Sequence, residues 1–464
     1  MVTIPEPHGR FIEGIYVGKK LKPDTVFSYK AYIPAEYDGT VPAALLICQD
    51  GLNITQVKVE DQLIAEGAMP VCIAIGLMPG SLKATREGAE DRYMRAEEYD
   101  QTGRGYPDFL VEEFIPWLCE REHLLISNSA DMHMISGGSS GASCAWNAAW
   151  YRNDYFHRVF LSSPSFIAFR GGEELLVLAR KAETRSIRAY LTLGTNEPNQ
   201  YAGSSYCVGI AAESALKYGG YEFAFKLFEG GGHCCGLNDP AVQEDVLRYL
   251  WKDWQRSPIR PMHLPDRISR MVDMDSVWEE VYVQIPEKCR AKTEQGIYSF
   301  NRNTILLTTP EGKTRVVADD FEEITSVAVS TDRWRLYIAD KRRRYIFAMS
   351  ICPDGSLKDK YILAPIHLSA DCRQIGATDL CVDIQDRIYA ATELGIQGII
   401  SFGIVDSIIP LPGDLPVQRI TFGGPMHDIL YAMSGERVFQ RKWKIRGCLE
   451  EDVPTNPTTP GYND

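Results

Sequence analysis

The residue pattern most typical of catalysis in this chain is Gly-Gly-Ser-Ser-Gly at residues 137–141. It fits G-x-S-x-G, in which the serine lies at the tip of a sharp turn between a strand and a helix. The outer glycines suit that turn, because their lack of side chains lets strand and helix approach each other. Residues 133–136 are typical of a strand end, and the alanine-rich residues 142–150 favour a helix. We therefore predict a nucleophile at Ser139; the competing interpretation is a structural glycine turn.

A carboxylate and a histidine that would activate this serine follow it in the chain. Glu197 comes just after the short apolar segment at residues 188–194, and His233 ends the triple-glycine loop after the alternating segment at residues 222–228. A serine hydroxyl is a poor nucleophile at neutral pH and needs a base, and the histidine needs a carboxylate that fixes its tautomer. Catalytic groups of open α/β sheets collect at the carboxyl ends of strands, where we expect all three side chains to meet.

Both partners of the serine have competing interpretations. His233 has the position of a loop histidine that caps the next helix. Asp239 and Glu229 are nearby carboxylates that compete with Glu197 for the role of the acid. The order of serine, acid and histidine along the chain favours Glu197 and His233.

The composition is that of an ordinary globular protein. The 464 residues are enough for two or three domains with their own cores, and 45% are hydrophobic and 24% charged. The net charge of −13 argues against a nucleic-acid partner. The one basic run, residues 341–344, lies between apolar segments and is interpreted as a solvated hairpin turn. No segment approaches the roughly 18 apolar residues of a membrane helix, so no membrane partner is expected.

Cysteine usage indicates a reducing compartment. The twelve cysteines are scattered, only Cys234 and Cys235 are adjacent, and several others lie inside apolar segments. This pattern is typical of reduced, buried thiols rather than of a disulfide framework. No C-x-x-C pair indicates zinc. The N-terminus lacks the basic start and the apolar run of a signal peptide, and we predict a cytoplasmic protein.

The first part of the chain predicts an α/β domain over residues 1–258. After a hairpin-like start at residues 9–34, strand and helix patterns alternate up to residue 254. Such alternation indicates βαβ units and a mostly parallel, doubly wound sheet. Residues 259–280 are rich in Pro, Arg, Met and Asp and are predicted to be a linker or an interdomain helix.

The second part predicts an all-β domain over residues 281–448. It shows only short strand patterns separated by turns, and the segments 324–340, 375–392 and 417–433 share one rhythm of strand, polar turn and strand. A repeat of about 40 to 50 residues with this rhythm is typical of β-propeller blades. Residues 449–464, rich in Pro, Thr, Asn and acidic residues, are predicted to be a disordered tail.

Residues 1–258 resemble the enterochelin-esterase-like branch of the α/β-hydrolases, which is related to esterase D and the feruloyl esterases. The matching segments are residues 31–37, 49–51, 95–100, 109–116, 135–141, 217–221, 229–233 and 247–251. The resemblance implies an α/β-hydrolase fold with Ser139 as nucleophile and His233 as base. The family usually carries Asp where this chain has Glu197, so the acid of this chain is one methylene longer.

The same resemblance implies two further features of the site. The oxyanion hole maps to the amide of Ser140 and to one amide at Gly51 or Leu52, since acyl transfer usually requires two donors aimed at the developing oxyanion. Arg95 matches the family's arginine beside the site, a candidate for holding an anionic or phenolic group of the substrate. The competing interpretation of Arg95 is an ion pair with one of the acidic residues in the segment 98–100.

The C-terminal part is similar to gluconolactonase-type propellers, most clearly over residues 376–447. About 170 residues make roughly four blades, where that family closes six. The metal-ligand positions of the family, an Asn and an Asp, fall on Thr325 and Thr378 here. Neutral hydroxyls are poor ligands for a hard cation, and Asp379 is one residue off and would point to the opposite face of its strand. We therefore expect a non-catalytic propeller that binds no metal.

Together these features predict a serine carboxylic-ester hydrolase that acts through an acyl-enzyme and needs no cofactor. The expected substrate is a small-molecule or glycan-linked ester of aryl or feruloyl, acetyl-sugar or siderophore-lactone type. One alternative is a metal-dependent lactonase in the propeller with an accessory hydrolase domain; another is a non-catalytic binding or assembly protein. A four-bladed set leaves exposed blade edges, so we expect the propeller to pack on the hydrolase domain or on a second subunit in a homo-oligomer.

Overall fold

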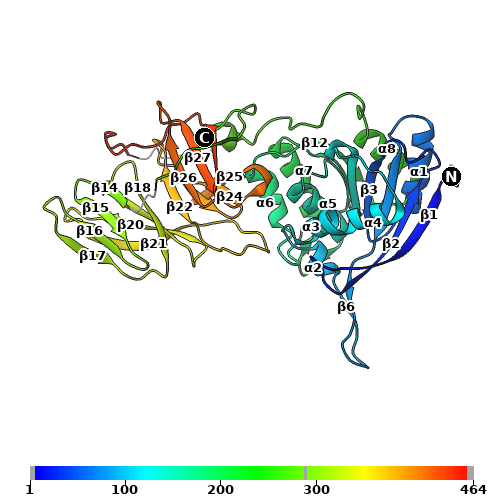
Figure 1. Ribbon diagram of the computed structural model, residues 1–464, viewed down its shortest axis with the longest axis horizontal. Coiled ribbons are helices and arrows are strands. Elements are labelled where there is room, and N and C mark those ends of the chain that lie inside the picture. Colours follow the sequence, from blue (N-terminus) through cyan, green and yellow to red (C-terminus); the bar gives the residue numbers. More distant parts are fainter. Residues whose placement is uncertain (1–5, 287–289, 457–464) are drawn as a thin grey trace. The chain divides into compact units, whose positions relative to one another are not determined.

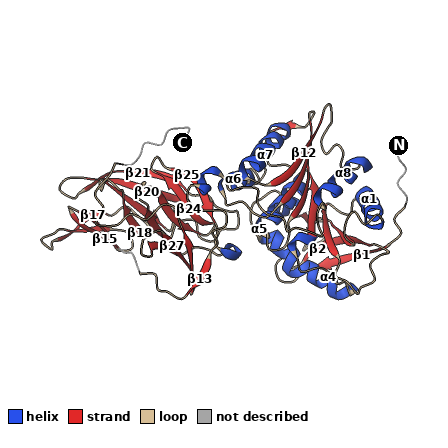
Figure 2. Cartoon of the chain, turned by 90° about the horizontal axis from the view of Figure 1, so that it is seen from above, coloured by secondary structure: helices blue, strands red, loops and turns tan. Residues whose placement is uncertain are grey.

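The chain folds into two units of different class. The structure, a computed structural model, describes residues 6–286 and 290–456. The units divide between residues 263 and 264, and the short segment 181–183 is assigned to the second unit. The first unit combines helices and strands, whereas the second is built almost entirely of strands (Figure 2).

The first unit is built around one ten-stranded sheet with helices on both of its faces (Figure 1). Its strands are β1 (Arg10–Val17), β2 (Thr25–Ile33), β3 (Ala44–Gln49), β4 (Cys72–Leu77), β5 (Ser81–Leu82), β6 (Arg92–Tyr93), β7 (His133–Gly138), β8 (Arg158–Ser162), β9 (Arg188–Gly194) and β12 (Glu222–Phe228). They run in the order β12-β9-β8-β7-β3-β4-β2-β5-β6, and β1 pairs with β2. The six strands from β12 to β4 are parallel, and the others pair antiparallel. This mostly parallel sheet confirms the predicted fold class.

The longer helices of this unit alternate with its strands, as the sequence pattern predicts, whereas the short helices α2 (Arg95–Tyr99) and α3 (Gly105–Asp108) are not predicted by it. The longer helices are α1 (Ile54–Ala65), α4 (Ile115–Glu122), α5 (Ser140–Tyr151), α6 (Glu174–Lys181), α7 (Ser205–Gly219) and α8 (Pro240–Leu250). A π-helical stretch at Phe109–Phe114 leads directly into α4. A 3₁₀ turn lies at Ala130–Met132, and the short strands β10 (Asn199–Gln200) and β11 (Gly203–Ser204) form a separate hairpin.

In the core of the first unit, helices α1 and α8 pack against the central strands of the sheet. Val57 of α1 and Val246 of α8 are fully buried in one cluster with Leu46 and Met134 of the central strands. All six residues of β3 are buried, as expected for a strand covered on both faces. Because β3, β7, β8, β9 and β12 are parallel, the loops that follow them meet at one edge of the sheet.

The second unit consists of four antiparallel sheets of four strands each, which form the blades of a small propeller-like ring. The blades are β14 (Arg290–Thr293), β15 (Gly296–Phe300), β16 (Ile305–Thr308) and β17 (Thr314–Ala318); β18 (Ile324–Val329), β19 (Arg335–Asp340), β20 (Tyr345–Ile351) and β21 (Leu357–Pro365); β22 (Asp379–Val382), β23 (Ile388–Thr392), β24 (Gly395–Ile400) and β25 (Ile404–Ile409); and β26 (Arg419–Gly423), β27 (Ile429–Ser434) and β28 (Arg437–Lys442) with β13 (Glu279–Val281). β13 precedes the other strands in the chain and pairs with β28, so the start of this unit completes its last blade. The predicted short propeller is present.

The segment predicted to be a linker, residues 259–280, is instead largely part of the second unit. Ile268, Met271 and Val272 are fully buried in the same cluster as Tyr389 and Trp443 of the propeller. Ile268 belongs to the short helix α9 (Asp266–Ser269). The second unit also contains a 3₁₀ turn at Pro412–Asp414. The few apolar residues of this segment lie among many polar ones without a clear period, which is why the sequence pattern does not predict their burial.

The predicted disordered tail differs from the structure over its first residues. The Arg333 guanidinium donates to the carbonyl of Leu449 at 2.7 Å. Thr331 and Thr455 exchange two hydrogen bonds, from the Thr455 amide at 3.1 Å and from the Thr331 hydroxyl at 3.0 Å. The backbone groups of Leu449 and Thr455 therefore bind to the propeller, a kind of contact that amino-acid composition does not predict. Residues 457–464 lie outside the described residues.

The basic run at residues 341–344 forms the turn between β19 and β20, as predicted. Arg342 and Arg343 pair with Glu323 and Glu322, each at 2.9 Å. These pairs neutralise much of the charge of the turn. Over the described parts of the chain, no helix combines the length and apolar character needed to cross a membrane.

Candidate active site

Ser139 occupies a strained turn between β7 and α5. Its φ is 58° and its ψ is −127°, a backbone conformation that residues with a side chain rarely adopt. A Cβ added at Gly137 would lie 2.3 Å from the carbonyl carbon of Gly141, and one added at Gly141 would lie 2.9 Å from Oδ2 of Asp50. Gly137 is therefore required by the close approach of strand and helix, whereas Gly141 leaves room for the side chain of Asp50. The predicted strand, turn and helix around Ser139 are confirmed.

Glu197 and His233 form the hydrogen bond that the sequence predicts. Oε2 of Glu197 lies 2.5 Å from Nδ1 of His233, and the Glu197 side chain is completely buried. The other carboxylate oxygen, Oε1, accepts hydrogen bonds from the Ser163 hydroxyl at 2.5 Å and from the Gly194 amide at 3.2 Å. Asp239, one of the competing carboxylates, instead caps α8 by accepting from the Ala241 amide at 2.9 Å.

The loops that carry Glu197 and His233 are tied to each other. The Asn196 amide donates to the Gly231 carbonyl at 2.8 Å, and the Gly230 amide donates to the Thr195 hydroxyl at 2.8 Å. A Cβ added at Gly194 would lie 2.2 Å from the Gly231 carbonyl oxygen, so only glycine permits this approach. The glycines that the sequence pattern singles out thus hold the acid and the histidine in one rigid corner.

The hydroxyl of Ser139 is not hydrogen-bonded to His233 in this structure. Its Oγ lies 3.0 Å from Oγ of Ser165, and among the described residues no hydrogen bond joins Ser139 to His233. Catalytic hydrogen bonds are often long or misaligned until substrate is bound. The structure thus brings Glu197 and His233 together and places Ser139 at the same edge of the sheet, with its hydroxyl turned toward Ser165.

The protonated form of His233 is favoured by its surroundings. The Cys234 thiol and the Glu197 carboxylate raise the pKa of His233 to about 9, while partial burial of the ring opposes them. The Cys234 amide also donates to the Ser163 hydroxyl at 2.9 Å, so Ser163 connects the histidine loop to the acid. Sequence reasoning missed Ser163 and Cys234. The available signal was the Ser-Ser-Pro-Ser run that directly follows the core of β8.

The two predicted oxyanion donors differ in what their amides contact. The Gly51 amide donates to the Leu77 carbonyl at 3.2 Å, whereas no acceptor for the Leu52 amide is found among the described residues. Ser140 is the first residue of α5, and the first amides of a helix lack intrahelical acceptors. A Cβ added at Gly76 would lie 2.0 Å from the Leu52 nitrogen, so Gly76 makes room for this loop. Leu52 is thus the better candidate of the two.

Arg95 is held beside the site by a different acid from those expected. Its Nε and Nη2 donate to the two oxygens of Asp50 at 2.7 and 2.8 Å, and its guanidinium lies 5.3 Å from the centre of the Tyr99 ring. Glu98 accepts instead from the Gly80 amide at 2.9 Å. The ion pair to Asp50 fixes the guanidinium next to the loop that carries Leu52.

A cavity of about 480 Å³ connects these groups. Ser139, Leu52, Arg95 and Cys234 all line it, and His233 does not. The cavity continues past Ser139 to residues at the ends of β3 and β7 and at the start of α1. The arrangement can therefore accommodate a small organic group next to a strained serine and free backbone amides.

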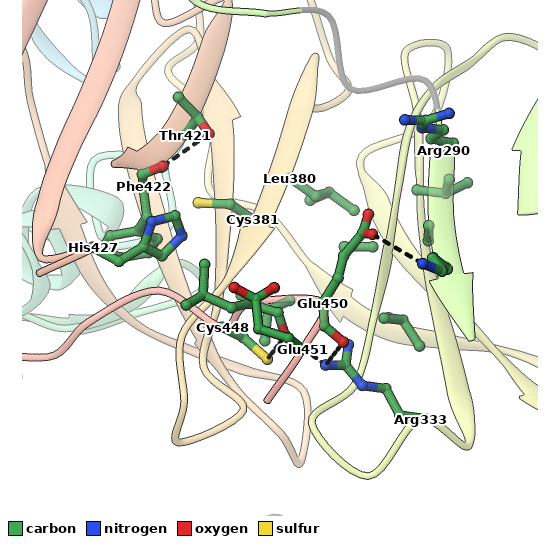
Figure 3. A pocket seen from close by; sticks show the side chains of 17 residues that line it. Arg290, Arg333, Leu380, Cys381, Thr421, Phe422, His427, Cys448, Glu450 and Glu451 are labelled. Carbon is green, nitrogen blue, oxygen red and sulfur yellow. Dashed lines mark hydrogen bonds and ion pairs between the residues drawn. The ribbon is translucent and has the colours of Figure 1, made fainter. Parts of the chain in front are cut away.

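A second cavity, of about 420 Å³, lies in the propeller (Figure 3). Residues of the inner strands β14, β18, β22 and β26 line it together with the chain segment 448–451. Figure 3 shows Arg333 reaching the backbone of this segment. The segment lies against residues of several blades and closes part of the cavity.

The threonines at the predicted metal-ligand positions bridge neighbouring blades. The Thr325 hydroxyl donates to the Ala377 carbonyl at 2.8 Å, and the Thr378 hydroxyl donates to the Val417 carbonyl at 3.0 Å. Asp379 accepts from the Ser326 hydroxyl at 2.8 Å and from the Ile420 amide at 3.0 Å. Within residues 6–286 and 290–456, no group of three or more His, Cys, Asp or Glu side chains is placed to hold a metal ion.

The strained Ser139 at the carboxyl edge of a mostly parallel sheet, with a buried acid and a histidine on neighbouring loops, defines an α/β-hydrolase. Residues 24–217 match the family model Esterase, described as "Putative esterase". This match covers most of the first unit, and the chain is a carboxylic ester hydrolase. Among curated proteins, none matches this sequence.

Solved structures resemble each part of the chain at low identity. A ferulic acid esterase is 16% identical with a TM-score of 0.40 and covers 53% of this chain and 98% of its own. The enterochelin esterase from Shigella flexneri is 18% identical with a TM-score of 0.40 and covers 54% of this chain and 60% of its own. A gluconolactonase from Xanthomonas campestris is 21% identical with a TM-score of 0.27 and covers 31% of this chain and 46% of its own. This chain thus spans about half the length of that gluconolactonase.

Proposed function

We propose that the first unit hydrolyses carboxylic esters through Ser139, His233 and Glu197, with an acyl-enzyme intermediate. The observation that carries this proposal is the completely buried Glu197, whose carboxylate lies 2.5 Å from Nδ1 of His233. A buried carboxylate in this position fixes the tautomer of the ring and leaves its other nitrogen for a serine. The strained Ser139 lies on a neighbouring loop at the same edge of the sheet.

In the proposed mechanism, the Ser139 hydroxyl turns from Ser165 toward His233 and attacks the ester carbonyl while His233 takes its proton. The amides of Ser140 and Leu52 stabilise the oxyanion of the tetrahedral intermediate. The intermediate collapses and expels the alcohol, which receives the proton from His233. Water, activated by His233 in the same way, then releases the acid and regenerates Ser139.

The substrate proposed here is a small ester of aryl or feruloyl, acetyl-sugar or siderophore-lactone type, free or linked to a glycan. Arg95 lies in the wall of the cavity that Ser139 lines, where a cation would hold an anionic or phenolic group. The pairing of Arg95 with Asp50 reduces its net charge, so we expect it to act through directed hydrogen bonds more than through charge.

The competing proposal, a metal-dependent lactonase in the propeller, has less support. The hydroxyls of Thr325 and Thr378 are hydrogen-bonded to carbonyls of neighbouring blades, and neutral hydroxyls are poorer ligands for a hard cation than carboxylates. Treatment with EDTA distinguishes the two proposals. We expect ester hydrolysis to be unchanged by EDTA; a loss that added divalent cation restores would favour the lactonase.

A homo-oligomer formed through the propeller and a cytoplasmic location remain predictions. Exposed apolar side chains on the outer strand β21, Tyr361 and Ile362, are the kind of edge residues that a second subunit would cover. Free thiols support a reducing compartment, since the cysteines of the described residues form no disulfide. The mass of the protein in solution tests the first prediction.

The substitution Ser139→Ala tests the proposed nucleophile. We expect it to remove hydrolysis of p-nitrophenyl acetate while the protein stays folded, because loss of a triad nucleophile costs several orders of magnitude in turnover. Ser129→Ala is the matched control, since Ser129 is an exposed serine just before the opposite end of β7. A folded Ser139→Ala variant with more than roughly a tenth of the wild-type activity would contradict the proposal.

A further inference from the structure

Part of the lining of the cavity at Ser139 is buried and polar. Gln56 of α1, Cys48 of β3 and Ser136 of β7 line it, and their exposed fractions are 1%, 2% and 4%. Cys48 and Ser136 are paired in the register of the parallel strands β3 and β7. Gln and Ser are mostly exposed in proteins, so the burial of Gln56 and Ser136 in one wall requires an explanation.

In the part of the chain that the structure describes, two side-chain amide nitrogens in the lining of this cavity are unused, Nε2 of Gln49 and Nε2 of Gln56. Oε1 of Gln56 lies 3.4 Å from both the Cys48 thiol and the Ser136 hydroxyl. Nε2 of Gln56 has no hydrogen-bond partner among the described residues. A buried donor without an acceptor is costly, and buried polar groups are normally paired with protein, water or ligand. The free amide nitrogen therefore marks a place for an acceptor atom.

The position of Gln56 is fixed by its surroundings. The Asn53 side chain caps α1 by accepting a hydrogen bond from the backbone amide of Gln56 at 3.1 Å. The same side chain donates to the Leu237 carbonyl at 2.9 Å. The first turn of α1 is thus bonded to the loop that also carries the catalytic histidine candidate. The backbone of Gln56 is thus held in place, and its buried side chain is part of the cavity lining.

The side of the ester that enters this cavity follows from the mechanism. The leaving alcohol receives its proton from His233 and must lie next to that ring. His233 does not line the cavity, whereas Ser139 and Leu52 do. The acyl group, which stays on Ser139 after the alcohol leaves, is therefore the part of the substrate that reaches toward Gln56.

We propose that the buried amide of Gln56 binds an oxygen atom carried by the acyl group, so that the preferred substrates are esters of short acyl groups with an ether, hydroxyl or keto oxygen. Plain alkanoyl groups of the same length leave the amide unpaired. This inference rests on the proposed function of Ser139, and it adds a specificity that the esterase mechanism alone does not require.

The test compares p-nitrophenyl methoxyacetate with p-nitrophenyl butyrate, which differ by one ether oxygen in place of a methylene. The ratio of their kcat/KM values is measured for the wild type, for Gln56→Leu and for Gln62→Leu, a control at an exposed glutamine of the same helix. The greater intrinsic reactivity of the methoxyacetate is the same for all three proteins and cancels. We expect Gln56→Leu to lower the ratio at least about tenfold and Gln62→Leu to leave it unchanged.

A second measurement needs only the wild type, in case Gln56→Leu does not fold. The ratio of kcat/KM values is divided by the ratio of the two alkaline hydrolysis rates, which removes intrinsic reactivity. We expect an excess of about tenfold or more for the methoxyacetate. Hydrolysis of both esters without such an excess, or an unchanged ratio in Gln56→Leu, would overturn the inference and leave the esterase proposal standing. Hydrolysis of neither ester would count against both.

Discussion

The hydroxyl of Ser163 lies 2.5 Å from Oε1 of Glu197 and donates a hydrogen bond to it. The same hydroxyl accepts from the Cys234 amide, next to His233. Ser163 directly follows β8, Glu197 follows β9 and Cys234 follows β12, so one serine joins the loops of three neighbouring strands. Ser163 thus connects the Glu197 side chain to the loop that carries His233.

Ser163→Ala is expected to lower kcat for ester hydrolysis about tenfold without removing activity. The substitution leaves a buried carboxylate oxygen with only the Gly194 amide, and hydrogen bonds to charged groups contribute about 1.5–3 kcal/mol. Steady-state kinetics and a thermal melt of the variant check this. A variant that melts at a lower temperature and yet keeps the wild-type kcat would assign Ser163 a purely structural role.

The pH dependence of the reaction follows from His233. Its raised pKa means that the ring is largely protonated at neutral pH and becomes a base only as the pH approaches about 9. We expect kcat/KM for p-nitrophenyl acetate, corrected for spontaneous hydrolysis, to rise with pH and level off above about 9. Cys234→Ala should move this rise to lower pH, because the thiol is the largest influence that favours the protonated ring. A profile that is flat above pH 7 would show that another group is the base.

The local patterns of the sequence predict the elbow and the acid–histidine pair well, because both depend on neighbours in the chain. Gly137 leaves room for a strand and a helix only a few residues apart, and the glycine loop before His233 packs on Gly194 for the same steric reason. The contacts of Ser163 and the free amide of Gln56 could not be predicted in this way. These contacts join segments that are far apart in the sequence, and they depend on how the strands are ordered and aligned in the sheet.

The propeller shows the same contrast. Its repeated strand rhythm predicts four blades, but the burial of Met271 and Val272 depends on how a polar segment folds back onto distant strands. Likewise, the sequence indicates that Thr325 and Thr378 are unsuited to a metal without indicating that their hydroxyls join neighbouring blades.

The buried Glu60 of α1 predicts a second pH effect, on stability. Burial raises the pKa of Glu60 to about 8, so its carboxyl keeps a proton in the folded protein that the unfolded chain releases near pH 4.5. The contribution of Glu60 to the free energy of unfolding is fully present below pH 4.5 and is lost as the pH rises toward 8. Glu60→Gln removes that loss and should stabilise the protein by about 3 kcal/mol at pH 7.

Thermal melts at pH 5 and pH 7.5 check the sign of this effect. Glu66→Gln, at the end of the same helix, is the contrasting variant, since Gln62 and Arg248 lower the pKa of Glu66 and the substitution should remove stability at neutral pH. If Glu60→Gln were less stable than the wild type at pH 7.5, the carboxylate would have to be charged and paired in the folded protein.

Gly76→Ala probes the loop that carries the Leu52 amide. The new methyl group would lie 2.0 Å from the Leu52 nitrogen and must displace it. Loss of one oxyanion donor lowers kcat by roughly a hundredfold to a thousandfold, and we expect a fall of about that size. Gly105→Ala is the control, because an added Cβ there meets no neighbouring atom. A folded Gly76→Ala variant with the wild-type kcat would exclude Leu52 as a donor.

Detection of the acyl-enzyme tests the central claim most directly. Acid quenching during turnover of p-nitrophenyl acetate, followed by proteolysis and mass spectrometry, locates any acetyl group that is covalently bound to the protein. Our account predicts one acetyl group on Ser139 that is absent from Ser139→Ala. An acetyl group on a different residue, with hydrolysis intact in Ser139→Ala, would contradict the account.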